Sequence, residues 1–161
     1  MTVSEYNKCV DDFSDGVFRF ILKNIKDKEN AKDIVQESFV RLWDKRAGVV
    51  YAKAKSYIFT TAYHILVDMV RKNKYSTAYS DHHENILTVE NQYSDLNGIL
   101  NEALEKLPVI QRTVILLRDY EGYSYHEIGE ITKLKESQVK VYIFRARMFL
   151  KQYIGSLDRV L

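Results

Sequence analysis

The chain has 161 residues, of which 46% are hydrophobic and 29% charged, and its net charge at pH 7 is +2. A single cysteine excludes an internal disulfide framework, and six glycines with one proline argue against a fold rich in tight β-turns. The first residues are polar and acidic, unlike a signal peptide, and no apolar run reaches the roughly 18 residues of a membrane span. We therefore expect a cytoplasmic protein that does not insert into membranes.

Apolar residues recur at helical spacing through the first half of the chain, which predicts three helices. These span about residues 4–25, 28–45 and 52–73. Gly16 weakens the first helix slightly, and Cys9 on the same helix is expected to be a buried small apolar residue. Because each helix has one apolar side, we expect the three to pack as a compact bundle.

The second half of the chain predicts four more helices, the first two at about residues 99–106 and 109–119. Ser124 lies three residues before Glu127, which is the spacing of a capping box at a helix start. A short helix to residue 131 and a long one over about residues 136–154 follow. The fold class is therefore all-α.

Between the two halves, residues 77–97 show no sustained periodicity and contain no Lys or Arg. Two interpretations stay open: an ordinary flexible linker, or an acidic segment that mimics a nucleic-acid backbone. His82–His83 has no further Cys or His nearby, so we expect no metal site and no other cofactor. We expect two small helical domains, residues 1–76 and 98–161, joined by this linker with its four acidic residues, Asp81, Glu84, Glu90 and Asp95.

The last two predicted helices form a helix-turn-helix. Ile128 and Ile131 should face Val139 and Ile143, while Gly129 allows the helices to cross closely and Leu134 fills the corner. The outward side of the second helix would then enter the major groove of DNA. An αα-hairpin with a solvated basic face is the alternative. The candidate DNA-binding residues are Lys135, Ser137, Gln138, Lys140, Val141, Tyr142 and Arg145.

Three motifs in this half resemble the promoter-binding C-terminal domain of bacterial sigma factors: Leu107–Pro108, Tyr120–Ser124 and Arg145–Arg147. Response-regulator output domains share a similar helix-turn-helix, so this half leaves both families open. In the first half, Asp33–Trp43 resembles the sigma-factor helix that docks on the polymerase clamp. Ser56–His64, with Asp68 and Arg71, resembles the helix that recognises the −10 element. The chain thus resembles an extracytoplasmic-function (ECF, group 4) sigma factor.

This resemblance implies a sigma factor, not an enzyme, that binds core RNA polymerase and directs promoter-specific transcription initiation through −10 and −35 elements. It implies three partners: core polymerase, promoter DNA and an anti-sigma factor. The residues named above on the second helix of the helix-turn-helix would contact the −35 element. The polymerase-binding candidates are Asp33, Gln36, Glu37, Phe39, Arg41 and Trp43. The −10 candidates are Tyr51, Lys53, Lys55, Tyr57, Tyr63, His64, Arg71 and Lys74.

The sequence departs from the family pattern at three places. Tyr63–His64 stands where Arg-Asn is usual, and Val141–Tyr142 stands where Ser-Arg is common. Lys135 replaces the Ser or Thr that often caps the −35 helix, which leaves Ser137 or solvent to cap it. The target bases at −10 and −35 therefore do not carry over from the family.

Two other classes of protein compete with this interpretation. An ordinary helix-turn-helix regulator would bind duplex DNA without polymerase, as a dimer on a palindrome. A nucleic-acid-processing enzyme would need the clustered carboxylates of two-metal chemistry, and the sequence does not present them.

Overall fold

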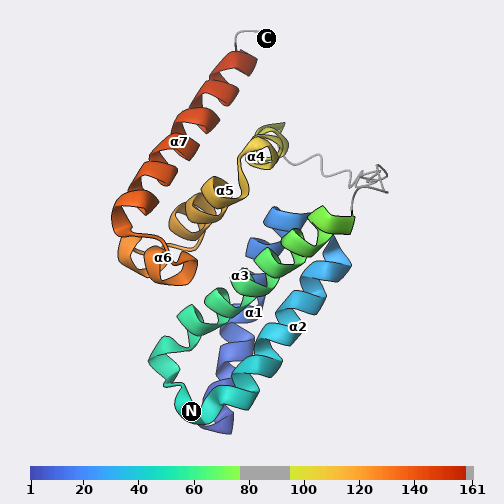
Figure 1. Ribbon diagram of the computed structural model, residues 1–161, viewed down its shortest axis with the longest axis vertical. Helices are drawn as coiled ribbons and strands as arrows, with labels where there is room; N and C mark the ends of the chain where they lie inside the picture. The colour runs from blue at the N-terminus through green and yellow to red at the C-terminus, as the bar shows by residue number, and fades with distance from the viewer. Residues whose placement is uncertain (77–94, 159–161) are drawn as a thin grey trace.

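The computed structural model describes residues 1–76 and 95–158, and within those ranges the chain is helical and contains no strand. Figure 1 shows α1–α3 packed as one group and α4–α7 as a second group. The all-α prediction is confirmed, whereas nearly all of the predicted linker lies outside the described residues. The elements are α1 (Val3–Ile25), α2 (Lys28–Lys45), η1 (Arg46–Gly48), α3 (Tyr51–Ser76), α4 (Asp95–Lys106), α5 (Val109–Ile115), η3 (Leu116–Tyr120), α6 (Tyr125–Thr132) and α7 (Glu136–Asp158).

Local capping fixes the starts of the first two helices. Thr2 and Glu5 form a capping box at the start of α1, and the Asp27 side chain accepts hydrogen bonds from two backbone amides at the start of α2. Between the two helices, Lys26 adopts the left-handed conformation with φ 56°. The bundle core that these helices build with α3 includes Cys9, as predicted, together with Val17, Ile21, Ile34, Leu42, Ile58 and Ala62.

Two elements of the second half differ from their predicted form. The helix expected over 109–119 divides into α5 and a wider π-helical turn, η3, which ends before Gly122 with φ +75°. Helix α4 begins at Asp95, inside the segment expected to be linker. The residues in the first turn of α4, such as Leu96, are exposed. This turn therefore has no buried apolar face, and the spacing of apolar residues did not predict it.

The helix-turn-helix corner forms as the sequence predicts. Ser124 and Glu127 make a reciprocal capping box at the start of α6. Ile128, Ile131, Val139 and Ile143 are all buried where α6 crosses α7. Asp119 accepts two hydrogen bonds from the Arg147 guanidinium, one of 2.6 Å, and so ties α7 to η3.

Gly129 is the point of closest approach in this corner. A Cβ atom at residue 129 would lie 2.8 Å from the backbone oxygen of Leu134, which cannot swing aside as a side chain would. We predict that Gly129→Ala lowers the free energy of unfolding by about 1–3 kcal/mol, the usual effect of overpacking. Chemical denaturation measures it. Gly155→Ala, a helical glycine with open space around it, is the control, and equal stability of both variants would contradict the prediction.

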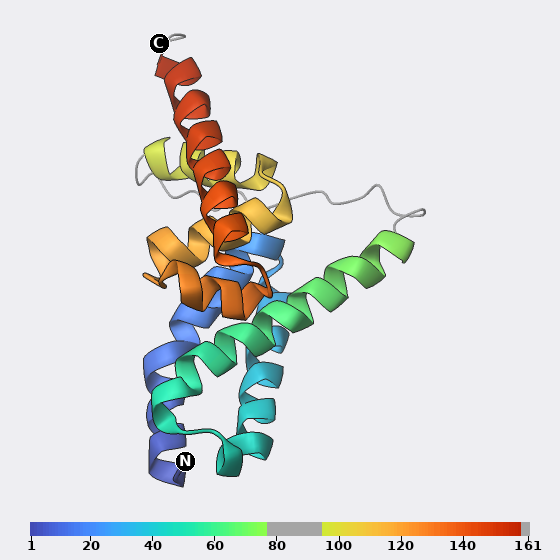
Figure 2. The same cartoon turned by 60° about the vertical axis from the view of Figure 1, so that its left-hand side comes forward.

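The two groups of helices pack against each other. Helix α6 lies against α3, while α4 and α5 contact α1, and Figure 2 shows α6 crossing beside the middle of α3. One hydrophobic core therefore runs through both halves of the described chain, from Val17 and Phe59 to Tyr123 and Ile128.

Candidate functional site

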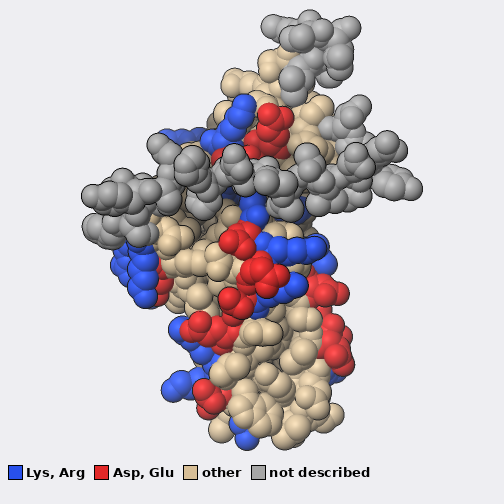
Figure 3. Space-filling view, turned by 90° about the vertical axis from the view of Figure 1, so that its right-hand side faces the viewer, with Lys and Arg blue, Asp and Glu red and all other residues tan. Residues whose placement is uncertain are grey.

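Helix α2 presents a polar stripe to solvent. Asp33, Gln36, Glu37 and Arg41 are all exposed, at the spacing of one helix face, and Arg41 pairs with Glu37. Val40 lies within this stripe and is 57% exposed. Val40 was not among the predicted site residues, although an exposed valine between charged side chains indicates a contact surface. Figure 3 views the molecule from the side on which α2 lies in Figure 1, and acidic and basic side chains are intermixed there.

Two of the six polymerase-binding candidates lie at or below the edge of this stripe. Phe39 is buried in the core, and its carbonyl accepts a 3.0 Å hydrogen bond from the Tyr6 hydroxyl. The half-buried Trp43 ring meets the Tyr6 ring edge-on at 4.9 Å, and the Arg46 guanidinium lies 3.7 Å from its centroid. Phe39 therefore holds α2 in the core of the bundle. Trp43 packs at the edge of the stripe, between Tyr6 and Arg46.

A cavity of about 310 Å³ lies between α2 and α3. Its lining includes candidates of both kinds. Arg41 is a predicted polymerase-binding residue, and Tyr57 and His64 are predicted to contact the −10 element. The Tyr57 ring offers an aromatic face, and the other side chains offer donors and one carboxylate. The lining residues are Arg41, Asp44, Lys45, Tyr57, Thr61 and His64.

The remaining −10 candidates differ in their exposure. Lys53 and Arg71 are exposed, with Arg71 donating a 2.9 Å hydrogen bond to Asp68, and Tyr51 is half-buried. Lys55 is half-buried, with its ammonium over the Tyr123 ring, whereas Tyr63 is 9% exposed and burial raises its pKa. Lys74 belongs to α3, but its side chain is outside the described part.

Helix α7 carries the −35 candidates on its outward side. Lys135, Ser137, Lys140, Val141 and Arg145 are exposed, and Tyr142 is half-buried. Gln138 also lies outside, but its side-chain oxygen accepts a 3.0 Å hydrogen bond from the Lys135 amide. Gln138 thus supplies the half of a capping box that pairs with the Lys135 amide, which differs from the cap that a Ser or Thr at position 135 would give to the first amides of the helix.

Large apolar side chains also lie on this side of α7, where the sequence analysis selected only Val141. Phe144 is 65% exposed and Met148 is 41% exposed. With Val141 they recur at helical spacing and form an exposed apolar strip beside Arg145. Their position three and seven residues after Val141 was the sequence signal for them.

Residues 1–76 and 95–158 contain no group of three or more His, Cys, Asp or Glu side chains arranged to hold a metal ion. None of the helices described there combines the length and apolar character of a membrane span.

Each half of the chain matches a known protein family. Residues 9–75 match the Sigma-70 region 2 family, and residues 97–150 match the Sigma-70, region 4 family. The RNA polymerase sigma factor SigV of Bacillus subtilis (strain 168) is 30% identical over 153 residues, which cover 93% of this chain and 91% of SigV. The chain belongs to the ECF sigma factors. The ECF RNA polymerase sigma factor SigM of the same organism is 29% identical over 156 residues, 94% of each chain.

As an ECF sigma factor, the protein binds core RNA polymerase and directs promoter-specific transcription initiation. This confirms the family and the function that the motifs in the two halves predicted. The sigma factors are transcription proteins and not a family of enzymes.

Two solved structures share the fold of this sigma factor. The sigma factor RpoE, solved in complex with the anti-sigma factor NepR from Bartonella quintana, superposes with a TM-score of 0.83 at 23% identity, over 95% of this chain and 98% of that one. CnrH, solved in complex with the cytosolic domain of CnrY, superposes with a TM-score of 0.70 at 18% identity, over 94% and 88%.

Proposed function

We propose that the sigma factor divides its work among three surfaces on three helices. The α2 stripe binds core polymerase, α3 with the α2–α3 cavity recognises the −10 element, and the outward side of α7 recognises the −35 element. The observation that carries this assignment is the cavity, because it lies where the proposed polymerase surface and the proposed −10 surface meet. The sequence-based boundaries, 1–76 and 98–161, are kept for the proposed domains except that the second begins with α4 at Asp95.

The α2 stripe has the composition of a protein-binding surface. It combines an exposed valine, Val40, with charged groups of both signs in Asp33, Glu37 and Arg41. In protein interfaces, charged residues at the edge orient the partner, which is the role expected of Asp33, Glu37 and Arg41. An apolar residue at the centre, here Val40, adds affinity when binding removes it from water. Phe39 and Trp43 would act by holding the helix in place beneath this surface.

The α2–α3 cavity suits a base taken out of the DNA stack. A flipped base is held by stacking on an aromatic ring and by hydrogen bonds to its edge. Tyr57 supplies the ring, and His64, Lys45 and Asp44 supply donors and an acceptor. Melting of the −10 element would thus be driven by capture of one base, with Lys53 and Arg71 contacting the backbone on either side.

We predict that Tyr57→Ala weakens binding of polymerase holoenzyme to a single-stranded −10 oligonucleotide by about 1–3 kcal/mol, roughly thirtyfold in Kd at the middle of that range. Loss of one stacking face is the reason. Fluorescence anisotropy with the labelled strand measures it. Tyr57→Phe keeps the ring and should bind nearly as the wild type does, whereas equal affinity of the Ala variant would remove the cavity from the −10 site.

The α7 surface suits duplex recognition. Arg145 and Lys140 are exposed and can reach guanine edges or phosphates, while Val141 and Phe144 offer apolar contacts to thymine methyl groups. Since few basic residues are involved, the isolated sigma factor should bind promoter DNA weakly, and the polymerase should supply the rest.

Regulation by an anti-sigma factor also belongs to this proposal, together with a cytoplasmic location and the absence of catalytic activity. RpoE and CnrH, which share the fold, were each solved with a partner of this kind or a partner's cytosolic domain. The competing function, a regulator that binds DNA alone, has no specific observation in its favour.

A further inference from the structure

The cavity between α2 and α3 brings together one face of each helix. Its volume of about 310 Å³ lies at the lower end of the range for sites that hold a small molecule. The face of α3 contributes an aromatic ring, a hydroxyl and an imidazole, and the end of α2 contributes two cations and a carboxylate. These groups belong to Tyr57, Thr61 and His64 of α3 and to Arg41, Asp44 and Lys45 of α2. A planar group with several hydrogen-bonding atoms on its edge matches this composition.

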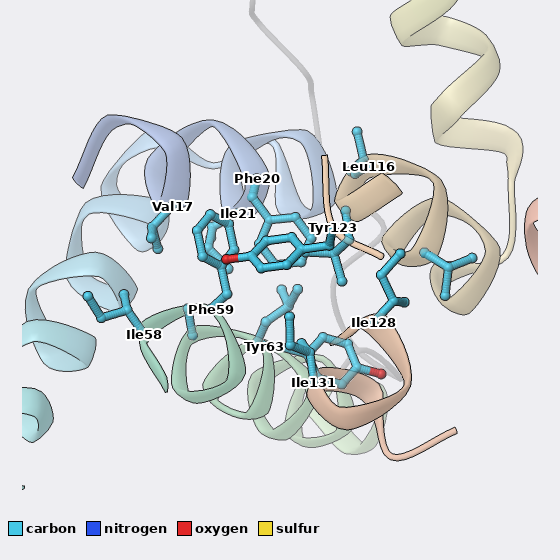
Figure 4. Packing of buried hydrophobic residues seen from close by; sticks show 14 of the residues in the cluster. Val17, Phe20, Ile21, Ile58, Phe59, Tyr63, Leu116, Tyr123, Ile128 and Ile131 are labelled. Carbon is cyan, nitrogen blue, oxygen red and sulfur yellow. The ribbon is translucent and has the colours of Figure 1, made fainter. Parts of the chain in front are cut away.

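Of the Tyr63–His64 pair, only His64 lines this cavity. Figure 4 shows the Tyr63 side chain near Ile131, among the packed hydrophobic residues, and Tyr63 is 9% exposed. His64 is half-buried and belongs to the cavity wall. The departure from the family pattern at these two positions therefore changes the cavity at one of them, so the bound base must be inferred from the side chains of this chain.

Three polar side chains of the cavity remain available to a ligand. The Arg41 guanidinium already has an acidic partner on its own helix, and the Thr61 hydroxyl donates a 2.8 Å hydrogen bond to a backbone carbonyl of α3. By contrast, the side chains of Asp44, Lys45 and His64 make no hydrogen bond or ion pair with any described residue. A base in the cavity would therefore meet one free carboxylate, one free ammonium and one free imidazole.

Asp44 lies where a carboxylate is unfavourable for the protein alone. It belongs to the last turn of α2, where the negative end of the helix dipole disfavours an anion. On a surface proposed to bind DNA, the phosphates also repel it. A carboxylate at this place favours binding only if it accepts hydrogen bonds from a base.

Guanine is the base whose edge fits a carboxylate beside a cation. Its Watson–Crick edge carries two neighbouring donors, N1–H and the N2 amine, so each carboxylate oxygen can accept one hydrogen bond. The next group along that edge, O6, is an acceptor and suits an ammonium group. Adenine and cytosine offer one amine beside an acceptor nitrogen, and thymine offers one N–H between two carbonyl groups. A carboxylate would be repelled by the lone pairs of those acceptors.

We propose that the α2–α3 cavity selects guanine from the single strand of the −10 element, and that Asp44 determines this choice. Tyr57 stacks on the base, Asp44 accepts hydrogen bonds from N1 and N2, and Lys45 donates one to O6. His64 closes the cavity from α3. This inference rests on the proposed capture of a −10 base in the cavity and adds the identity of that base.

Asp44→Asn tests the choice of base, because it should change the preference and not merely weaken binding. An amide offers one acceptor and one donor, the pattern that pairs with the N6 amine and the neighbouring acceptor nitrogen of adenine. Polymerase holoenzyme first selects single strands from a pool randomised over the −10 positions. Fluorescence anisotropy then compares the selected strand with strands in which each guanine in turn is replaced by adenine or by inosine, which lacks the N2 amine.

For the wild type, we expect adenine at one position to weaken binding about thirtyfold and inosine about tenfold. Asp44→Asn should reverse the preference at that position, so that the adenine strand binds about tenfold more tightly than the guanine strand. Asp11→Asn makes the same chemical change on the exposed side of α1 and should keep the wild-type ratios. A changed affinity for polymerase would alter binding of all strands equally and leave the ratios unchanged.

Selected strands without a common guanine would overturn the proposal, and so would an Asp44→Asn variant that keeps the wild-type ratio. Uniformly tighter binding by that variant would show that the carboxylate only repels DNA. Tyr57→Ala, measured on the same strands, separates these results from failure of the proposed function. If Tyr57→Ala weakens binding while the Asp44→Asn ratio stays unchanged, base capture stands and guanine is the wrong base. If Tyr57→Ala binds as the wild type does, the cavity is not the −10 site and both proposals fail.

Discussion

Core RNA polymerase will bind a Glu37→Lys, Val40→Glu double variant about a hundredfold more weakly than the wild-type sigma factor, a loss of about 3 kcal/mol. Both side chains lie on the exposed stripe of α2. Reversing Glu37 puts like charge beside Arg41, and a carboxylate at position 40 must be desolvated at the apolar centre of the contact. Surface plasmon resonance with immobilised core polymerase measures the affinity.

The folded state should tolerate these changes, because neither side chain belongs to the core. Asp11→Lys, on the exposed side of α1, makes the same local change of charge as Glu37→Lys and should bind as the wild type does. Unchanged affinity of the double variant, with an unchanged melting temperature, would remove α2 from the polymerase interface.

Arg145→Ala will weaken holoenzyme binding to a promoter by about 2 kcal/mol, roughly thirtyfold, while leaving the melting temperature of the sigma factor unchanged. Arg145 is exposed on the outward side of α7, where its guanidinium can contact a guanine edge or a phosphate. Competition binding on promoters altered at single −35 positions distinguishes contact with a base from contact with a phosphate. Loss of discrimination at one base pair indicates base contact, and a uniform loss indicates a phosphate.

Arg147, two residues further on, provides the matched comparison. Its guanidinium is held by Asp119, an interaction that raises its pKa and ties α7 to η3. Arg147→Ala should therefore lower the stability of the helix-turn-helix. An Arg145→Ala variant with wild-type promoter affinity would contradict the assignment of α7, and so would a loss explained entirely by unfolding.

Local features of the fold could be predicted from the sequence because their causes lie within a few residues. Helix α2 has the predicted bounds, and the Ser124–Glu127 capping box and the close crossing at Gly129 form as expected. Each rests on hydrogen-bond partners three residues apart or on steric contact within one short corner. The start of α4 was missed because its first residues have no apolar face.

The parts of the site that escaped prediction depend on contacts distant in the sequence. Tyr63 is polar enough to serve as a DNA contact, and only the packing of α6 on α3 shows that it is covered. The sequence indicates no role for Gly16, because Glu121, whose carboxylate lies beside it, belongs to the other half of the chain. Periodicity shows that a helix has an apolar face but does not show which distant element covers that face.

The central claim is that this sigma factor recognises a promoter only together with core polymerase. Run-off transcription from a template library randomised at the −10 and −35 positions tests it, with core polymerase alone, sigma factor alone and the two combined. We predict product only from the combination, from templates that share one motif at each element. Absence of promoter-specific product from the combination, or tight sequence-specific binding of duplex by the chain alone in a gel shift, would contradict it.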